Sequence, residues 1–165
     1  MSRPILKTEL KTLDWIIEVI TVFVLIGLAI YLLMEYRSLP GKIATHYGFS
    51  GNADTNGSKS TLWVLIGLTI VLYGLLTVVS RFPQKFNYPI EITEKNAPRQ
   101  YSLAIQMMRL LKLATVLIFT YLTYITISLA QGNASGLGSW FLPITLISIF
   151  GIIIFYTVKL FIKQS

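Results

Sequence analysis

Four long runs of apolar residues alternate with polar segments along the chain. They cover residues 15–34, 61–80, 110–130 and 140–161. Each run is nearly free of charge and close to the roughly 20 residues that a helix needs to cross the hydrocarbon core of a bilayer. A helix satisfies its own backbone hydrogen bonds, so it is stable where no water is available. The sequence therefore predicts an all-α integral membrane protein with four transmembrane helices.

The composition favours a membrane protein over a soluble domain. Of the 165 residues, 54% are hydrophobic and only 13% are charged, and the mean hydropathy is +0.67. About a quarter of the residues in a soluble domain are charged, so this chain has too few charges to cover a water-facing surface. A signal peptide is the competing interpretation of the first run. That run is longer than usual for a signal peptide and no small-residue cleavage site follows it, so we expect an uncleaved span.

The division of basic residues predicts the orientation. Eleven Lys and Arg residues lie in the N-terminal tail, in residues 81–112 and near the C-terminus, whereas residues 35–60 and 131–139 hold three. Lys and Arg collect on the cytoplasmic side of a membrane. We therefore expect both termini inside the cell, an ordered extracytoplasmic loop over residues 35–60, an inner connection over residues 81–109, and a location in the plasma membrane.

These expectations divide the chain into residues 1–14, an amphipathic cytoplasmic segment, residues 15–130, a three-span domain, and residues 140–161, the fourth span. The N-terminal segment has a row of apolar residues at helical spacing: Leu6, Leu10, Leu13 and Ile17. We expect this row to lie on the bilayer interface while Lys7 and Lys11 face lipid headgroups.

The third apolar run is predicted to continue toward its N-terminal side as a single long helix. Asn96 is a candidate N-cap and Pro98 is tolerated in a first helical turn, so the helix is expected from about Ala97. Its first third then projects from the bilayer. Four polar residues at helical spacing predict a solvated face there: Arg99, Ser102, Gln106 and Arg109.

Glu18 is an acidic residue inside the first apolar run. A carboxylate within a membrane is costly, so we expect Glu18 to face other helices or to reach toward Lys11 or Lys112. Either a proton or ligand site or a simple pair with a Lys is compatible with this position, and the pair is favoured because no other acid lies nearby in the spans.

The loop over residues 35–60 has a pattern of its own. Residues 42–47 alternate, which places Ile43, Thr45 and Tyr47 on one face of an extended segment. Gly48, Gly51 and the Asn56-Gly57 pair then indicate turns. We expect a short hairpin, or a tight extended lobe, across the outer ends of the helices.

The same loop holds two weak signals of chemistry. Asn52, Asp54 and Asn56 fit the first half of a calcium loop, but the twelfth position, which needs a bidentate Glu, holds Trp63. Local turns made by these side chains are the favoured interpretation. His46 is a possible base, with Asp54 to orient it and three hydroxyls as neighbours in sequence: Thr45, Ser50 and Ser58. Nothing in the sequence fixes their geometry, so we expect a structural His46.

Several classes of protein are disfavoured. The absence of Cys excludes disulfides and thiolate sites, and a single His makes a protein-only zinc site improbable. The basic residues are dispersed over segments next to the membrane, which argues against nucleic-acid binding. We expect no catalytic residues, no metal and no cofactor.

The loop residues resemble the signature of a bacterial membrane family, the domain of unknown function 1648. The matching residues are Leu39, Pro40, Ile43, Thr45, His46, Tyr47, Gly51, Asp54, Gly57, Ser58 and Lys59. A second resemblance lies in the inner connection: Phe86, Asn87, Tyr88, Pro89, Thr93, Glu94, Asn96, Arg99, Gln100 and Tyr101. Together they cover about residues 10–130. Ala44 replaces a second Pro that is usual in the family, and Asn56 stands where an aromatic residue is common.

The resemblance implies a function, because the same domain forms the N-terminal part of SdpI-type immunity proteins. Those proteins protect bacteria from a secreted toxin peptide and sequester a repressor at the membrane. It implies a non-enzymatic sensor or immunity role in which the matching loop residues other than Ile43 bind a peptide or protein partner. It does not extend to the C-terminal module of the longer members. Inner contacts to lipid or a cytoplasmic regulator are expected at Asn87, Tyr88, Pro89, Glu94, Arg99, Gln100, Tyr101 and Arg109.

Two other functions stay open at this point. The shortage of ionisable groups within the spans is compatible with an accessory subunit of a transporter or other membrane complex. A membrane hydrolase that uses His46 is the third hypothesis.

Overall fold

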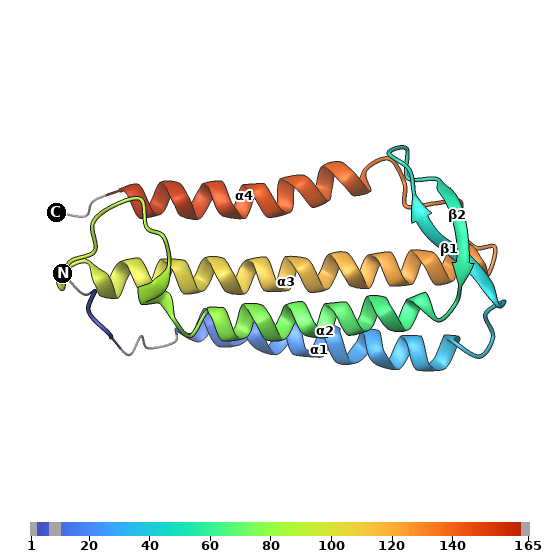
Figure 1. Cartoon of the computed structure of the whole chain (residues 1–165), viewed down its shortest axis with the longest axis horizontal. Coiled ribbons are helices and arrows are strands. Elements are labelled where there is room, and N and C mark those ends of the chain that lie inside the picture. Colours follow the sequence, from blue (N-terminus) through green and yellow to red (C-terminus); the bar gives the residue numbers. More distant parts are fainter. Residues whose placement is uncertain (1–2, 7–10, 163–165) are drawn as a thin grey trace.

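The computed structural model describes residues 3–6 and 11–162. Within these ranges the chain forms four helices, a two-stranded hairpin and one 3-10 turn (Figure 1). In chain order the elements are α1 (Thr12–Glu35), β1 (Lys42–Tyr47), β2 (Ala53–Ser58), α2 (Thr61–Val79), η1 (Pro83–Lys85), α3 (Ala97–Ala130) and α4 (Phe141–Phe161). All four helices are long and apolar enough to cross a membrane, which confirms the prediction of four apolar helices. The hairpin makes the fold mostly, rather than entirely, helical.

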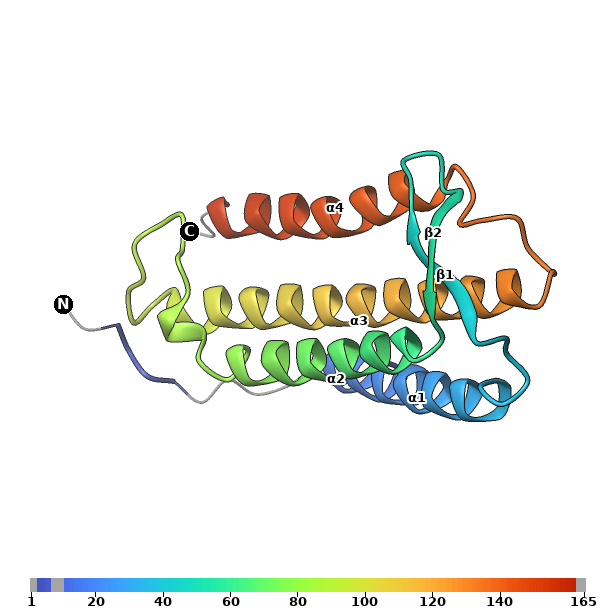
Figure 2. The same cartoon turned by 45° about the vertical axis from the view of Figure 1, so that its right-hand side comes forward.

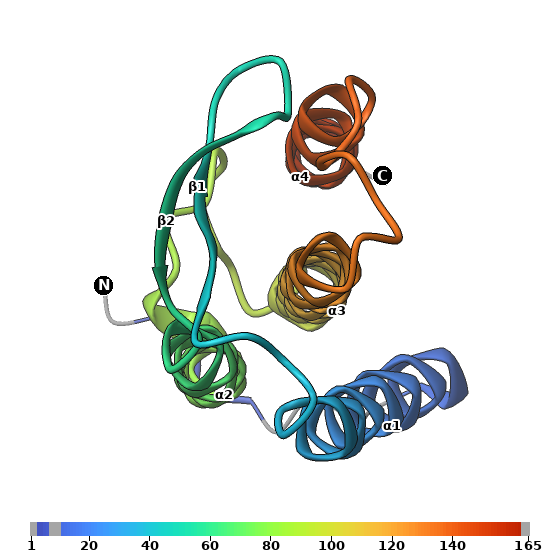
Figure 3. The same ribbon diagram turned by 90° about the vertical axis from the view of Figure 1, so that its right-hand side faces the viewer.

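Helix α3 occupies the centre of the bundle and packs against α1, α2 and α4 (Figure 3). The hairpin and the α3–α4 loop lie at one end, which we call the hairpin end. Residues 3–6 and the connection between α2 and α3 lie at the other, which we call the tail end (Figures 1 and 2). The long α3 therefore links the two parts of the molecule that the sequence singled out.

Each end of the bundle has its own apolar core. The hairpin-end core consists of Leu28, Leu32, Leu39, Ile43, Leu62, Ile66 and Ile127. The tail-end core consists of Tyr88, Ile92, Ala97, Tyr101, Ala104 and Leu160. Residues of the hairpin and of the α2–α3 connection take part in these cores, so both segments are integral parts of the fold.

The hairpin is antiparallel, as the alternation in its sequence predicts, and its turn lies at Gly48 and Gly51, two of the three places expected. The Gly48 amide donates to the Asn52 carbonyl at 3.0 Å and the Gly51 amide to the Gly48 carbonyl at 2.9 Å. Gly51 has a φ of 80°, a conformation that glycine adopts without strain. The Asn56-Gly57 pair forms no turn and is part of β2.

The N-terminal tail differs from the predicted amphipathic helix. Residues 3–6 are not helical, so Leu6 does not extend the helical row, and Lys7 and Leu10 lie outside the described residues. The tail instead binds the tail-end core, where the Tyr101 hydroxyl donates to the Pro4 carbonyl at 2.9 Å. These contacts favour an extended tail because a helix would use the same carbonyl internally.

Helix α3 begins after Asn96, as expected, and contains Pro98 in its first turn. The Asn96 side chain does not cap the helix, since its Oδ1 accepts the Thr93 amide at 2.9 Å. The predicted solvated face is wrong at Arg109, which keeps only 9% of its surface exposed. Arg109 Nη1 donates to the Asp14 carbonyl at 2.6 Å, an acceptor that α1 brings to this position.

Candidate functional site

Lys59 fastens the base of the hairpin to the end of α1. Its Nζ donates to the carbonyls of Tyr36 at 3.1 Å and Leu39 at 3.0 Å, and it lies 4.8 Å from the centre of the Tyr36 ring. A cation at the carboxyl end of a helix also interacts favourably with the helix dipole. Leu39 itself is buried in the hairpin-end core. Lys59 and Leu39, both predicted as binding residues, are therefore occupied in holding the loop.

Tyr47, the last residue of β1, anchors the hairpin to α3. Its hydroxyl is hydrogen-bonded to Thr126 Oγ1 at 2.8 Å, and burial raises its pKa above the ordinary value.

Thr45 Oγ1 donates to the Thr55 carbonyl at 3.4 Å. A Cβ on Gly57 would lie 2.8 Å from Thr45 Cγ2, so this close strand contact requires glycine.

The tip of the hairpin is held by the α3–α4 loop. The Leu137 amide donates to the Gly51 carbonyl at 2.8 Å, and the Tyr121 hydroxyl donates to the Leu137 carbonyl at 2.8 Å. The two backbones approach closely. A Cβ on Gly136 would lie 2.5 Å from the Gly51 carbonyl oxygen, and a Cβ on Gly51 would lie 2.9 Å from the Gly138 carbonyl oxygen. The hairpin thus has fixed contacts at its base, at the end of β1 and at its tip.

His46 and Asp54 form the main polar pair on the exposed part of the hairpin. His46 Nδ1 lies 2.6 Å from Asp54 Oδ1, and the side chains are 67% and 48% exposed. This bond lowers the pKa of Asp54 below its ordinary value, as does a hydrogen bond from Thr55 Oγ1. The strand register shifts on both sides of His46, which leaves Thr45 and Asp54 without register partners. Such irregularities redirect side chains, and here they accompany the meeting of His46 and Asp54.

The remaining predicted loop residues lie at the surface. Pro40 and Ser58 are exposed, and Ser58 Oγ is hydrogen-bonded to Ser60 Oγ at 2.8 Å. Phe49, at the hairpin tip, is 97% exposed. Sequence reasoning did not single out Phe49, although a large apolar residue between two turn-forming glycines is the signal that could have done so.

The chemistry available at this pair is limited. No group of three His, Asp or Glu residues that could hold a metal occurs among the residues that the structure describes. His46 and Asp54 have the relation of a base and its orienting carboxylate. The contacts of His46 within the described ranges include no hydrogen bond to a hydroxyl, so a nucleophile is not brought to it. The pair is suited to hydrogen bonding and charge recognition.

The predicted inner-face residues divide into a buried and an exposed group. Tyr88 and Tyr101 are buried, with ring centres 5.8 Å apart. The Tyr88 hydroxyl donates to the Pro83 carbonyl at 2.9 Å, and burial raises its pKa. Arg3 donates to the Phe86 carbonyl and lies over the Tyr88 ring at 5.5 Å. The tyrosines therefore fasten the tail to the connection.

Two further inner-face residues bind the end of α4. Arg99 donates to the carbonyls of Ile162 at 3.0 Å and Lys159 at 3.1 Å. Buried Gln100 donates through Nε2 to the Leu160 carbonyl at 3.3 Å. The other predicted contacts are exposed and available to a partner: Asn87, Pro89 and Glu94.

Glu18 is paired with Lys112, one of the two partners expected from the sequence. Lys112 Nζ lies 2.6 Å from Glu18 Oε2 and 2.8 Å from Oε1, and it also donates to Thr77 Oγ1 at 2.9 Å. The Tyr73 hydroxyl donates to Glu18 Oε1 at 2.6 Å. Side chains of α1, α2 and α3 meet in this cluster, which makes it a structural link between the three helices.

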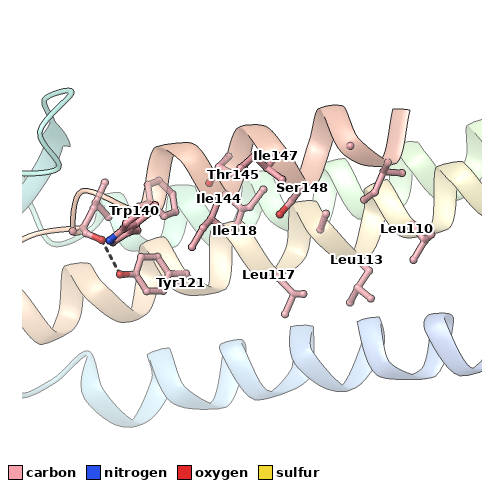
Figure 4. A pocket seen from close by; sticks show the side chains of 16 residues that line it. Leu110, Leu113, Leu117, Ile118, Tyr121, Trp140, Ile144, Thr145, Ile147 and Ser148 are labelled. Atoms are coloured by element: carbon pink, nitrogen blue, oxygen red, sulfur yellow. Dashed lines mark hydrogen bonds between the residues drawn. The ribbon is translucent and has the colours of Figure 1, made fainter. Parts of the chain in front are cut away.

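A large apolar cleft lies between α3 and α4. It has a volume of about 900 Å³, and Leu113, Leu117 and Ile118 of α3 and Ile144, Thr145 and Ser148 of α4 line it (Figure 4). Of the described residues of α4, only Tyr156 and Leu160 are buried. Most of α4 therefore faces its surroundings.

Comparison with known proteins gives one family match. Residues 22–70 match the family model described as domain of unknown function (DUF1648). No curated protein matches the chain, and no solved structure matches it. The matched residues run from within α1, through the whole hairpin, into α2, and the match includes no SdpI C-terminal module. The resemblance indicated by the loop motif is thus confirmed for residues 22–70, a segment consistent with a DUF1648 domain.

Proposed function

We propose that this protein is a non-enzymatic sensor or immunity-type protein of a bacterial plasma membrane, which engages a peptide or protein partner through its hairpin. The observation that carries the proposal is the exposed His46–Asp54 pair on a hairpin held at three points. An anchored backbone loses little conformational freedom when a partner binds, and loops on a rigid scaffold commonly carry recognition.

The proposed partner offers groups that complement this surface. Asp54 accepts hydrogen bonds and attracts a basic group, while His46 provides a second polar contact. Phe49 adds an apolar contact at the hairpin tip, where it is 97% exposed. A peptide with basic and apolar side chains fits these requirements.

The proposal includes an orientation with both termini in the cytoplasm. Nine of the eleven basic residues counted on the inner side are described, and these nine lie at the tail end of the bundle; the three counted on the outer side lie at the hairpin end. This distribution along the bundle supports an external hairpin, because cytoplasmic segments are enriched in Lys and Arg.

The test is a triple substitution of the exposed hairpin surface in the bacterial host: His46→Ala, Phe49→Ser and Asp54→Asn. These changes leave the contacts of Tyr47, Gly51 and Lys59 in place. We expect normal abundance in the membrane with loss of tolerance to the peptide that the host secretes, or loss of the transcriptional response to it. Ser135→Ala, an exposed change at the same end, is the control. Unchanged tolerance and transcription in the triple variant would refute the proposal.

A second candidate function is an accessory subunit of a transporter or other membrane complex. The exposed length of α4 and the cleft of about 900 Å³ favour it, since a helix of a partner would cover both. Gly151 lines the cleft, and a Cβ there meets nothing within 4 Å, so Gly151→Leu fills the cleft without disturbing the fold.

For this candidate we expect a stoichiometric partner in mild detergent that is lost with Gly151→Leu. It should be retained with Val158→Phe, a change of an exposed α4 residue that does not line the cleft. Purification as a monodisperse lone protein would count against it. The hydrolase hypothesis has weaker support, and normal function of His46→Ala would eliminate it.

A further inference from the structure

A cavity of about 430 Å³ lies at the tail end, where the start of α1, the end of α2 and the middle of α3 meet. Its lining residues are Leu6, Trp15, Glu18, Thr77, Ser80, Arg81, Pro83, Ile105, Arg109 and Lys112. Three of these side chains are basic and one is acidic, so the lining has an excess of positive charge.

The Lys112 and Glu18 charges balance each other. Lys112 Nζ uses its three donors on Glu18 Oε1, Glu18 Oε2 and Thr77 Oγ1. Glu18 also accepts from Tyr73. The carboxylate accepts three hydrogen bonds, and the remaining positive charge of the lining is that of Arg81 and Arg109.

Arg109 is a buried cation with unused donors. Its Nη1 donates to the Asp14 carbonyl and forms a long ion pair with Glu18 Oε2 at 4.0 Å, beyond hydrogen-bond distance. Its Nε has no partner within the described part of the chain. The nearby Asp14 side chain does not line the cavity. Its Oδ2 accepts the Lys11 amide, and its Oδ1 is buried without a hydrogen-bond partner among the described residues. A buried donor without an acceptor is costly, and an anion in the cavity would supply one.

The apolar lining indicates what kind of anion fits. Trp15, 57% exposed, and Leu6, 38% exposed, lie beside the basic groups. Trp15 belongs to the first turn of α1, and Ser80 follows the last turn of α2, which places the cavity where the spans end. Tryptophan is enriched at this level of a bilayer, and basic pockets between transmembrane helices bind anionic headgroups.

We infer that this cavity binds the phosphate of an anionic phospholipid headgroup. Arg109 holds the phosphate from within the bundle and Arg81, which is exposed, from the mouth of the cavity. Trp15 and Leu6 contact the glycerol and the upper part of an acyl chain. This inference depends neither on the proposed function nor on the orientation of the protein.

The test uses Trp15 as an internal probe. With Trp63→Phe and Trp140→Phe, Trp15 is the only tryptophan left of three. The full chain is placed in phosphatidylcholine vesicles that contain a small fraction of either brominated phosphatidylglycerol or brominated phosphatidylcholine. We expect stronger quenching of Trp15 by the brominated anionic lipid than by the brominated neutral lipid at equal fraction.

In this background, Arg109→Gln should reduce the preference for the anionic lipid about fivefold, and Arg81→Gln should reduce it similarly. Lys95→Gln is the matched control, because Lys95 is an exposed basic residue at the same end of the bundle that does not line the cavity. Arg81 is exposed, so Arg81→Gln tests the inference even where Arg109→Gln fails to fold. Arg109→Lys keeps the positive charge and should retain most of the preference for the anionic lipid.

Three results would overturn the inference. The first is equal quenching by both lipids in the parent. The second is an unchanged preference in a folded Arg81→Gln or Arg109→Gln variant. The third is a loss of the preference for the anionic lipid when chloride is replaced by inorganic phosphate at equal ionic strength. We expect the preference to remain; its loss would assign the cavity to soluble phosphate.

Discussion

At the scale of single residues, three glycines decide whether the hairpin tip can reach the α3–α4 loop. Gly51 and Gly138 have positive φ angles, and Gly136 lies against the Gly51 carbonyl. A side chain at Gly136 would have to displace backbone rather than a flexible side chain. The contact between hairpin and loop therefore depends on glycine at these positions.

Gly136→Ala should break the hydrogen bond from the Leu137 amide to the Gly51 carbonyl. One net hydrogen bond of about 1 kcal/mol corresponds to roughly fivefold faster exchange of that amide. Hydrogen exchange measured by mass spectrometry on the α3–α4 loop checks this. Gly41→Ala is the control because a Cβ there meets nothing within 4 Å. Equal exchange of the Leu137 amide in the two variants would show that this contact does not hold the hairpin tip.

The His46–Asp54 bond predicts a pH dependence. The pKa of Asp54 is lowered in the folded protein, so the bond stabilises the hairpin above the ordinary pKa of Asp and is lost as the pH falls through the lower folded value. In His46→Ala the midpoint of the Asp54 carboxyl titration, followed by NMR, should move upward. Asn52→Ala, whose amide side chain bonds Ser50, should leave it unchanged. The same midpoint in His46→Ala and the wild-type protein would contradict the bond.

The loop motif was visible in the sequence, but the separate roles of its residues were not. Lys59 and Tyr47 carry polar groups typical of binding residues, yet both are engaged with the helices. Their hydrogen-bond partners are the Tyr36 carbonyl and the Thr126 hydroxyl, which only the folded chain brings near. Arg109 was misplaced for the same reason, because its acceptor belongs to α1. Periodicity identifies a helix face but not the polar groups that another helix presents to it.

At the scale of elements, the Glu18–Lys112 pair joins α1 to α3 and, through Thr77, to α2. Lys112→Met should lower the free energy of unfolding by about 3 kcal/mol, because it leaves the Glu18 carboxylate, 19% exposed, without its main partner. The double variant Glu18→Gln with Lys112→Met should lose less free energy of unfolding than Lys112→Met alone, because it leaves no unpaired carboxylate. Unfolding in mixed micelles followed by circular dichroism measures both.

Lys95→Met is the control for this pair, since Lys95 is exposed and surface changes of this kind cost within about 0.5 kcal/mol. A loss in Lys112→Met no larger than in Lys95→Met would contradict a structural role for the pair.

The helices themselves were predictable, because runs of about 20 apolar residues have few alternatives. The hairpin was predictable from alternation, and its turn from Gly48 and Gly51. The turn expected at Asn56-Gly57 was wrong, because this common turn sequence is part of β2, where Gly57 lies against Thr45. The contact of the tip with the α3–α4 loop was missed. Its signal in the sequence was the close spacing of Gly136 and Gly138. These glycines indicate a close backbone contact only once the fold places Gly51 beside them.

At the scale of the whole molecule, α3 connects two ends with different chemistry. The hairpin end presents an anchored polar surface with an exposed aromatic tip, and nine of the fourteen basic residues lie in described segments at the tail end. This asymmetry along one axis supports the proposed orientation.

The orientation can be tested by labelling with a membrane-impermeant maleimide, because the chain has no Cys and each introduced thiol is therefore unique. Phe49→Cys reports the hairpin tip and Lys95→Cys reports the exposed tail end. In intact cells we expect labelling of Phe49→Cys, and labelling of Lys95→Cys only after permeabilisation. Labelling of Lys95→Cys in intact cells with a protected Phe49→Cys would place the hairpin inside and refute its role in external recognition.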